Sequence, residues 1–175
     1  ATFSAGEVIE IIESTSTSIG GDDHILVGDG SDIVLAGYGR DRINVTLPED
    51  TDSFAVSFGP LTFTLDGEIL VDHSTLLDGT DSGDDIFLGD SGRIEFHTVG
   101  SFLAGEEVVD LITTMAPEHG SVDLIYADGG KDIILGGTGS DWIVAHQADN
   151  NDHDMDIILG DNGYAVFDVD QLTVT

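Results

Sequence analysis

The sequence predicts an all-β protein with almost no helix, in which short strands are arranged in two tandem copies. Three observations predict this fold class. The 175 residues include 23 glycines, many of them in short segments that also contain Asp, and both residue types favour turns. Between these segments lie short apolar runs rich in Val and Ile, which favour strands over helices. The chain also aligns with itself, so most of these runs occur twice.

Acidic residues dominate the charge of the chain. Lys and Arg together number 4 against 35 Asp and Glu, which gives a formal net charge of −31. A charge of this size opposes compaction, yet 40% of the residues are hydrophobic, which favours a folded core over disorder. Divalent cations are the simplest means of neutralising the carboxylates. Asp makes up 26 of the acids, and its carboxylate is a hard oxygen ligand suited to calcium.

The composition excludes several classes of partner. A protein with so few basic residues offers no basic patch for nucleic acid and is repelled by anionic membrane surfaces. No apolar run approaches the roughly 20 residues that a membrane-spanning helix requires. The chain has no Cys, so disulfides do not stabilise it. We therefore expect neither a nucleic-acid partner nor insertion into a membrane.

A gapless alignment of the chain with itself defines the two copies. Residues 7–44 align with residues 107–144 at a shift of 100, and residues 85–92 align with residues 156–163 at a shift of 71. The difference of 29 residues is an insertion in the first copy, at about residues 46–80. We therefore divide the chain into a first copy, residues 1–100, and a second copy, residues 101–175.

A shorter period lies inside each copy. Aspartates recur every nine residues: Asp23, Asp32 and Asp41, then Asp123, Asp132 and Asp141. The clearest repeat is the run Gly136-Gly137-Thr138-Gly139-Ser140-Asp141, which precedes Trp142-Ile143-Val144. Because strand side chains alternate, one apolar residue after each turn is expected to point inward. These inward positions are Ile25, Val34, Ile43, Phe87 and Phe96 in the first copy and Ile125, Ile134, Ile143, Ile158 and Phe167 in the second.

On these residues the chain resembles the RTX, or haemolysin-type, calcium-binding repeat family, whose pattern is G-G-x-G-x-D-x-U-x. The resemblance covers about residues 18–45, 80–97 and 118–168. It implies a calcium-binding parallel β-roll in two tandem copies, in which two nonapeptides form one coil. Calcium then lies between successive turns on the same edge of the roll. The alternative interpretation is that Asp and Gly form ordinary turns without metal.

The resemblance also implies which residues bind calcium. It pairs turn 18–23 with turn 36–41, turn 27–32 with turn 80–85, and turn 36–41 with turn 89–94. For the whole chain it implies about four to six Ca²⁺ ions. The implied ligand residues are Asp23, Asp32, Asp41, Asp85, Asp90, Asp123, Asp132, Asp141, Asp156, Asp161, Gly28, Gly30, Gly37, Gly39, Gly130, Gly137 and Gly139.

The last turn of each copy departs from the pattern. The position that should carry Asp is Ile94 in the first copy and Ala165 in the second. Both turns carry an aspartate earlier, Asp90 and Asp161, within a Gly-Asp-x-Gly segment. We expect these two carboxylates to replace the missing ligand from the other end of the turn.

Three further segments are expected to form strands outside the repeats. The insertion contains residues 54–58, 61–65 and 68–71, which are apolar or alternate and are separated by Gly59-Pro60 and Asp66-Gly67. This predicts a small antiparallel meander, which either covers the roll or binds a partner such as a carbohydrate. Residues 8–12 and 108–112 are predicted to form a strand that opens each copy.

Alternate strands of the roll carry aliphatic residues where polar ones are expected. Large aliphatics flank the inward position and point outward, and an exposed patch of this size is rare on monomers. We expect this face to be covered by the opening strands, the insertion, the other copy or a neighbouring molecule. The residues concerned are Ile33, Leu35, Ile86, Leu88, Ile133, Leu135, Ile157 and Leu159.

We expect no enzymatic activity in this chain. It has no Cys nucleophile and no Gly-x-Ser-x-Gly segment, and its acids lie in turns rather than in a cleft that would tune a catalytic pair. His153 and Asp154 lie in a longer loop, where an acidic bulge is a simpler interpretation than a transition-metal site. Trp142 either packs against a neighbouring element or stacks on a sugar.

The sequence therefore predicts a calcium-dependent structural module of a secreted or cell-surface bacterial protein. The resemblance implies type I secretion as an unfolded chain and folding at extracellular calcium concentrations. The tandem copies predict self-association or contact with neighbouring repeats, in adhesion or in assembly of a surface layer, filament or matrix. Two alternatives remain: a glycan- or cell-binding adhesin module, and the calcium-folding tail of a secreted enzyme.

Overall fold

The structure, a computed structural model, describes residues 9–45, 57–59, 62–65, 68–70, 83–99, 106–127, 129–145 and 155–167. Every regular element in these ranges is a β-strand, and two of the four sheets are parallel, which confirms the predicted all-β class. None of the described residues forms a helix long and apolar enough to cross a membrane.

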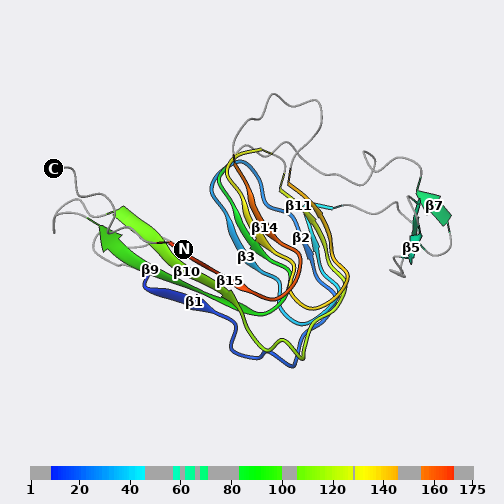
Figure 1. Cartoon of the computed structure of the whole chain (residues 1–175), viewed down its shortest axis with the longest axis horizontal. Helices are drawn as coiled ribbons and strands as arrows, with labels where there is room; N and C mark the ends of the chain where they lie inside the picture. Colours follow the sequence, from blue (N-terminus) through cyan, green and yellow to red (C-terminus); the bar gives the residue numbers. More distant parts are fainter. Residues whose placement is uncertain are drawn as a thin grey trace.

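Two parallel sheets face each other and form a roll (Figure 1). The first roll sheet has the order β2 (His24–Ile25), β4 (Arg42–Ile43), β11 (Leu124–Tyr126) and β13 (Trp142–Val144), numbered here from the start of the roll. The second roll sheet has the order β3 (Ile33–Leu35), β8 (Ile86–Leu88), β12 (Ile133–Leu135) and β14 (Ile157–Leu159). The chain alternates between the sheets, so each coil contributes one strand to each sheet.

Both roll sheets run through the boundary between the two sequence copies. β4 pairs with β11, with Ile43 opposite Ile125, and β8 pairs with β12, with Phe87 opposite Ile134. The strand order in each sheet is the order in the sequence. Residues 1–100 and 101–175 are therefore copies in sequence that share continuous sheets.

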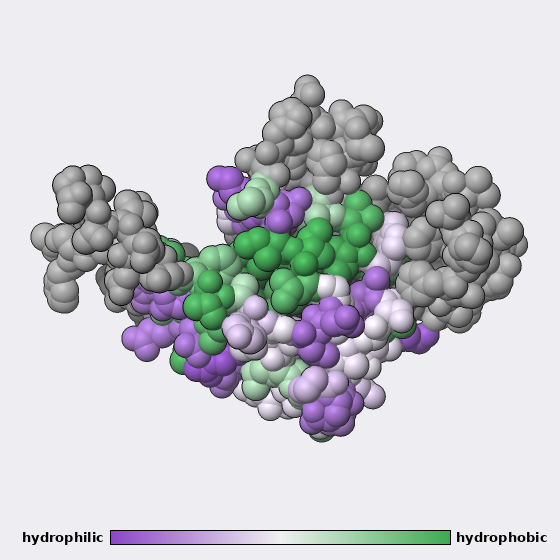
Figure 2. Space-filling view, viewed as in Figure 1, coloured by the Kyte–Doolittle hydropathy of each residue, from purple (hydrophilic) through white to green (hydrophobic). Residues whose placement is uncertain are grey.

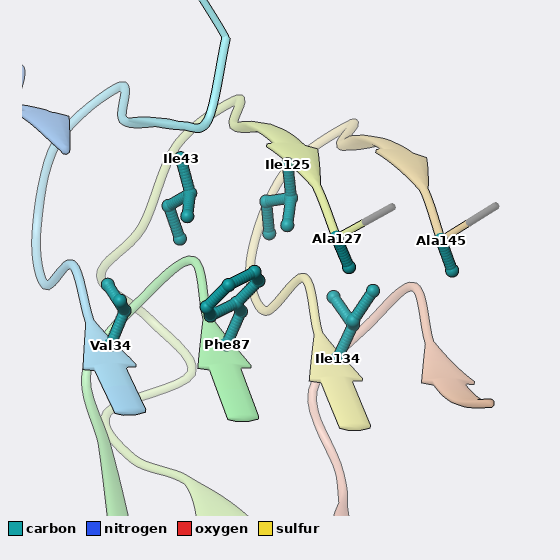
Figure 3. Close-up of a cluster of buried hydrophobic side chains, with 7 residues drawn as sticks. All are labelled: Val34, Ile43, Phe87, Ile125, Ala127, Ile134 and Ala145. Carbon is teal, nitrogen blue, oxygen red and sulfur yellow. The ribbon is translucent and has the colours of Figure 1, made fainter. Parts of the chain in front are cut away.

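The side chains between the two roll sheets form the first core. Figure 3 shows Val34, Phe87 and Ile134 from one sheet pointing towards Ile43 and Ile125 from the other. Ile25 and Ile143 pack against the same cluster, which confirms seven of the ten predicted inward positions. A narrow core of this kind accepts one apolar side chain per strand, because the neighbouring positions on a strand point to the opposite face.

Three of the predicted inward positions lie elsewhere. Ile158 is 50% exposed, because β14 is the last strand of its sheet and no further coil covers it in the described residues. Phe96 and Phe167 do not enter the space between the roll sheets. They pack in a second core, outside the second roll sheet, because the chain leaves the roll before reaching them.

A third, antiparallel sheet covers the outer face of the second roll sheet, and we call it the cover sheet. Its order is β1 (Ile11–Glu13), β9 (Gly92–Val99), β10 (Glu106–Thr114) and β15 (Tyr164–Val166). β10 contains the whole of the predicted opening strand at residues 108–112. β1 begins only at Ile11, so it overlaps the predicted strand at residues 8–12 in its last two residues, and residue 8 lies outside the described residues. Within each copy the pairing has the same register: Ile12 lies opposite Ile94, and Ile112 lies opposite Ala165.

The cover sheet explains the aliphatic residues on the outside of the roll. Leu88 and Leu135 point away from the roll interior and are fully buried against Ile94 and Ile112 of the cover sheet. Leu35 and Leu159, on the outer strands, pack against the same cluster and are partly buried. The predicted covering is therefore confirmed, and the opening strands of both copies contribute to it.

The insertion forms a separate three-stranded antiparallel sheet, which confirms the predicted meander. Its strands are β5 (Ser57–Gly59), β6 (Thr62–Leu65) and β7 (Glu68–Leu70) in that order. Phe58 lies opposite Phe63, and Thr64 lies opposite Ile69.

Candidate metal centre

A row of four aspartates runs along one edge of the roll, and we call it the Asp23 ladder. Its members each directly precede a strand of the first roll sheet. In each rung the backbone N–H donates to a carboxylate oxygen of the next: Asp23 N to Asp41 Oδ1 at 2.8 Å, Asp41 N to Asp123 Oδ1 at 2.8 Å, and Asp123 N to Asp141 Oδ1 at 3.0 Å. The ladder therefore continues from the first copy into the second.

A second row, the Asp32 ladder, runs along the opposite edge. Its aspartates precede the strands of the second roll sheet, and the same type of bond joins them: Asp32 N to Asp85 Oδ1 at 2.8 Å, Asp85 N to Asp132 Oδ1 at 3.0 Å, and Asp132 N to Asp156 Oδ1 at 3.1 Å. All eight predicted repeat aspartates thus lie in the two ladders, with the predicted assignment of edges.

The ladders follow from the nine-residue period. One nonapeptide makes half a coil, so aspartates eighteen residues apart, such as Asp23 and Asp41, stack directly on each other. The residue that follows an aspartate also bonds to the neighbouring rung. The Leu124 N–H, for example, donates to the Asp41 carbonyl oxygen at 2.9 Å. The bonded aspartates therefore fix the backbone of one turn to the backbone of the next.

Three carboxylates of the Asp23 ladder, those of Asp41, Asp123 and Asp141, are costly to ionise. Burial, together with the charges of Asp90, Asp141 and Asp41, raises the pKa of Asp123 to about 9, against the hydrogen bond from the Asp41 N–H. Burial likewise raises the pKa of Asp41 to about 7 and that of Asp141 to about 6. A bound cation would remove this cost, because it favours the charged form of each carboxyl.

The second oxygens of these carboxylates are buried without a partner. Asp41 Oδ2, Asp123 Oδ2 and Asp141 Oδ2 receive no hydrogen bond, although a buried polar atom normally has a partner. Asp41 and Asp123 are both fully buried. Three successive rungs therefore each leave an acceptor oxygen buried, where a proton or a cation could serve as its partner.

Two glycines allow the backbone to approach two of these oxygens closely. A Cβ on Gly89 would lie 2.4 Å from Asp123 Oδ2 and 2.6 Å from the Gly136 carbonyl oxygen. A Cβ on Gly136 would lie 2.5 Å from Asp141 Oδ2 and 2.6 Å from the Gly160 carbonyl oxygen. Each glycine thus lets a carboxylate oxygen and the carbonyl oxygen of the following turn approach its backbone more closely than a side chain would allow, and we call these the Gly89 and Gly136 cradles.

The predicted turn glycines have a different part in the site. Gly37 and Gly137 have φ values of 103° and 100°, which residues with a side chain rarely adopt. A Cβ on Gly139 would lie 1.8 Å from the Ser121 carbonyl oxygen, so glycine permits close stacking of the turns there. Gly30, Gly39 and Gly130 also have positive φ. Gly28 has neither feature, and a Cβ there would meet no atom within 4 Å.

The structure corrects the prediction for the turn at residues 89–94. These residues do not complete a turn, because β9 begins at Gly92 and Ile94 is buried under the cover sheet. The chain leaves the roll at Asp90, forms β9 and β10, and re-enters the edge before Asp123. Asp123 therefore stands next to Asp41 in the ladder, where the prediction placed the turn at residues 89–94.

Asp90 and Asp161 differ in spite of their equivalent positions in the sequence. Asp90 is 1% exposed, its Oδ2 accepts hydrogen bonds from the backbone, including that from Thr138 N, and its Oδ1 has no hydrogen-bond partner. Burial raises its pKa to about 6, and the Asp141 carboxylate adds to the rise. Asp161 is exposed, although its charge contributes to the raised pKa of Asp141. The expected replacement of a missing ligand thus fits Asp90 better than Asp161.

The donors present suit a hard cation. They are carboxylate and carbonyl oxygens, which calcium accepts in flexible arrangements of six to eight ligands. Among the described residues, no three His, Asp or Glu side chains converge as a metal-binding group, so backbone carbonyls would have to supply many of the ligands. Asp41, Asp90, Asp123 and Asp141 are the side chains that could hold the ion on this edge.

Some predicted features lie outside the described residues. They include residues 80–82 of the turn before Asp85, and His153 with Asp154 in the loop of the second copy.

Trp142 lies in β13 opposite Leu124 and is half-buried, so a part of it packs within the protein.

Sequence reasoning missed Gly89 and Gly136 as site residues. Both directly follow the leucine that ends a strand of the second roll sheet, and Gly160 occupies the same position in the last turn. This shared position after Leu88, Leu135 and Leu159 is the signal in the sequence. At the equivalent position in the first turn the chain has Ala36, so the residue type there varies.

The comparisons with known proteins give no match. No protein-family model matches the chain, and neither a curated protein nor a solved structure is significantly similar to it.

Proposed function

We propose that this chain is a structural module that folds on binding calcium between successive turns of its two aspartate ladders. The observation that supports this most directly is the row of buried, unpartnered oxygens on Asp41, Asp123 and Asp141. The Gly89 and Gly136 cradles place a carbonyl oxygen next to two of them. The resemblance of the nonapeptides to the RTX repeat supports the same ion.

The charge of the chain supports a coupling of folding to metal binding. At a net charge of −31, stacking the aspartates into ladders brings like charges together, which opposes folding. Calcium that binds only the folded form contributes its binding free energy to folding. The chain would then be extended without calcium and compact with it.

The calcium affinity that is typical of such modules suggests where this one works. Extracellular calcium-binding modules bind with Kd values of roughly 10⁻⁴–10⁻³ M, which suits millimolar extracellular calcium. We therefore propose that the module is secreted or displayed on the cell surface and is exported before it folds. Its role would be structural, in adhesion or in assembly of an extracellular layer, rather than catalytic.

Circular dichroism during a calcium titration tests the proposal. We expect a β-sheet spectrum in calcium and a disordered spectrum in chelator, with a midpoint in the extracellular range. Magnesium at the same concentration should be much less effective, because it requires a small, near-octahedral site. Equal β content in calcium and in chelator would contradict the proposal.

A further inference from the structure

All three packed sheets end in open strands, and the two ends of the molecule differ. In the strand orders, β1, β2 and β3 stand first, whereas β15, β13 and β14 stand last. We call these the start face and the end face. No described strand pairs with the outer edge of any of them. An open strand edge presents backbone donors and acceptors to solvent and is a template for a further strand.

The junction between the two copies shows what such faces bind. There, β4, β8 and β9 of the first copy pair with β11, β12 and β10 of the second. By the internal repeat, the end face consists of the counterparts of β4, β8 and β9. The start face consists of the counterparts of β11, β12 and β10. The chain thus contains one formed example of its end face bound to its start face.

The aspartate ladders can continue across such a contact. At the junction, Asp41 N–H donates to Asp123 Oδ1, and the Leu124 N–H donates to the Asp41 carbonyl. The counterpart of Asp41 at the end face is Asp141, and the counterpart of Asp123 at the start face is Asp23. A molecule stacked on the end face would therefore bring its Asp23 carboxylate to the Asp141 N–H in the same geometry.

Apolar side chains are exposed on both faces where the junction buries their counterparts. Ile158 of the end face is 50% exposed, whereas its counterpart Phe87 is fully buried. Leu26 of the start face is 54% exposed, whereas its counterpart Tyr126 is 1% exposed. Figure 2, in the same view as Figure 1, shows hydrophobic residues gathered in the middle of the face towards the viewer. Further exposed apolar residues on the two faces are Ile11, Ile33, Tyr164 and Val166.

We propose that a second copy of this chain docks head to tail, with its start face on the end face of the first. In the register of the junction, Ile157, Ile158 and Leu159 of one molecule pair with Ile33, Val34 and Leu35 of the next. Val166 of the cover sheet pairs with Ile11. The contact is heterologous, because it joins two different faces, and it leaves a free face at each end. Stacking therefore continues into an open filament.

This inference rests on the proposed function, because the two faces exist only in the folded, calcium-bound chain. Calcium also has to offset the repulsion between two chains of net charge −31. Sedimentation velocity in calcium is the direct measurement, on samples whose circular dichroism shows the folded β-sheet spectrum. We expect the wild-type chain to form rods whose length increases with protein concentration.

Variants of the two faces separate head-to-tail docking from other association. Ile158→Glu on the end face and Ile33→Glu on the start face place a carboxylate in the contact. Each should weaken self-association at least about tenfold, because a buried unpaired charge is costly. Lys131→Gln changes the net charge by the same amount at an exposed position in the middle of the roll, and it should assemble like wild type.

Mixing the two face variants gives the sharpest result. Ile158→Glu retains an intact start face and Ile33→Glu retains an intact end face, so the mixture should form a dimer that neither variant forms alone. If each variant dimerises alone, or if the folded wild type stays monomeric at every concentration, head-to-tail docking is wrong. That outcome leaves the calcium-folding proposal intact, whereas failure to fold in calcium contradicts that proposal instead. Should either variant lose its folded spectrum, Val166→Glu and Ile11→Glu on the cover sheet replace the pair.

Discussion

The backbone N–H of Asp41 donates a hydrogen bond of 2.8 Å to Oδ1 of Asp123, although the two residues are 82 positions apart and belong to different copies. Both side chains are fully buried, and each has a second carboxylate oxygen without a partner. This contact makes the two copies one roll. It also brings two carboxylates together where only a proton or a cation can compensate the charge.

The Asp123→Asn variant should have opposite effects on the metal-free and the calcium-bound chain. Burial raises the pKa of Asp123 to about 9, so a neutral amide should stabilise the fold in chelator at neutral pH. The same change removes a ligand charge, which should lower calcium affinity at least about tenfold. Thermal unfolding in chelator and calorimetric titration measure the two effects.

Glu118→Gln is the matched control, because it removes one charge from an exposed side chain. It should change neither quantity appreciably. A loss of stability in both conditions for Asp123→Asn would show that the carboxylate is a structural hydrogen-bond acceptor alone.

Without metal, the fold should become less stable as the pH rises. The pKa values of Asp41, Asp90, Asp123 and Asp141 are about 7, 6, 9 and 6 in the folded chain, against 3.8 for the unperturbed carboxyl. The folded state binds protons more tightly than the unfolded state at these four carboxyls. The stability that this protonation contributes is complete below pH 3.8 and is lost as the pH rises through 6 to 9. Circular dichroism in chelator should show most β-sheet at about pH 4 or below and least above pH 9.

Ordinary surface carboxylates titrate near pH 4 and do not explain a change between pH 6 and 9. Combined Asp41→Asn and Asp123→Asn substitution should therefore flatten the curve in that range. Calcium binding should release protons there. A curve in chelator that is flat from pH 6 to 9 in the wild type would contradict the raised pKa values.

The Gly89 and Gly136 cradles predict that a methyl group disturbs one calcium site. In Gly136→Ala the Cβ would lie 2.5 Å from Asp141 Oδ2 and 2.6 Å from the Gly160 carbonyl oxygen, which is too close for either contact, so these two candidate ligands would have to move. We expect the number of bound ions, measured by calorimetry, to fall by one. Gly160→Ala is the control at the same position of the next turn, where a Cβ meets no atom within 4 Å. Equal stoichiometry in the two variants would contradict the cradle.

Asp90 and Asp161 should differ in their contribution to calcium binding, although the sequence gives them the same Gly-Asp-x-Gly context. Asp90 is buried with an unpartnered Oδ1 and accepts the Thr138 N–H, whereas Asp161 is exposed. Asp90→Asn should lower calcium affinity at least about tenfold, because it removes a buried ligand charge. Asp161→Asn should lower it by a smaller factor, since solvent screens that charge. Calorimetric titration of both variants tests the order, and equal losses would show that burial does not distinguish them.

The nine-residue period and the RTX resemblance together predicted most of the two aspartate ladders. The resemblance, in which two nonapeptides form one coil, placed Asp23 and Asp41 on one edge and Asp32 and Asp85 on the other. The same period predicted the inward residues of the roll, such as Val34 and Ile134. These features depend on contacts between neighbouring repeats, which local spacing determines.

The parts that the sequence did not predict depend on contacts between distant segments. Ile94 in place of the expected Asp is a departure from the repeat pattern, but it does not show that the chain leaves the roll at Asp90, because the Gly-Asp-x-Gly segment there resembles an ordinary repeat turn. The exit of the chain from the roll depends on the pairing of β9 with β10, in which Ile94 lies opposite Ile112. Similarly, the Gly89 and Gly136 cradles depend on the distance between successive turns, which residue spacing does not give.

The cover sheet predicts a stability effect that the roll alone would not. Leu135 points out of the roll and would be exposed without β9 and β10, yet it is fully buried against Ile94 and Ile112. Leu135→Ala should therefore lower the free energy of unfolding of the calcium-bound chain by about 2–5 kcal/mol, as for a core leucine.

Ile19→Ala is the control, because Ile19 is 77% exposed and its truncation should cost about 0.5 kcal/mol or less. Urea unfolding in saturating calcium measures both free energies. Equal, small losses in the two variants would mean that the cover sheet separates from the roll in solution, since Leu135 would then be as exposed as Ile19. A large loss in Leu135→Ala with unchanged calcium stoichiometry would place the stabilisation in the second core, apart from the metal sites on the ladders.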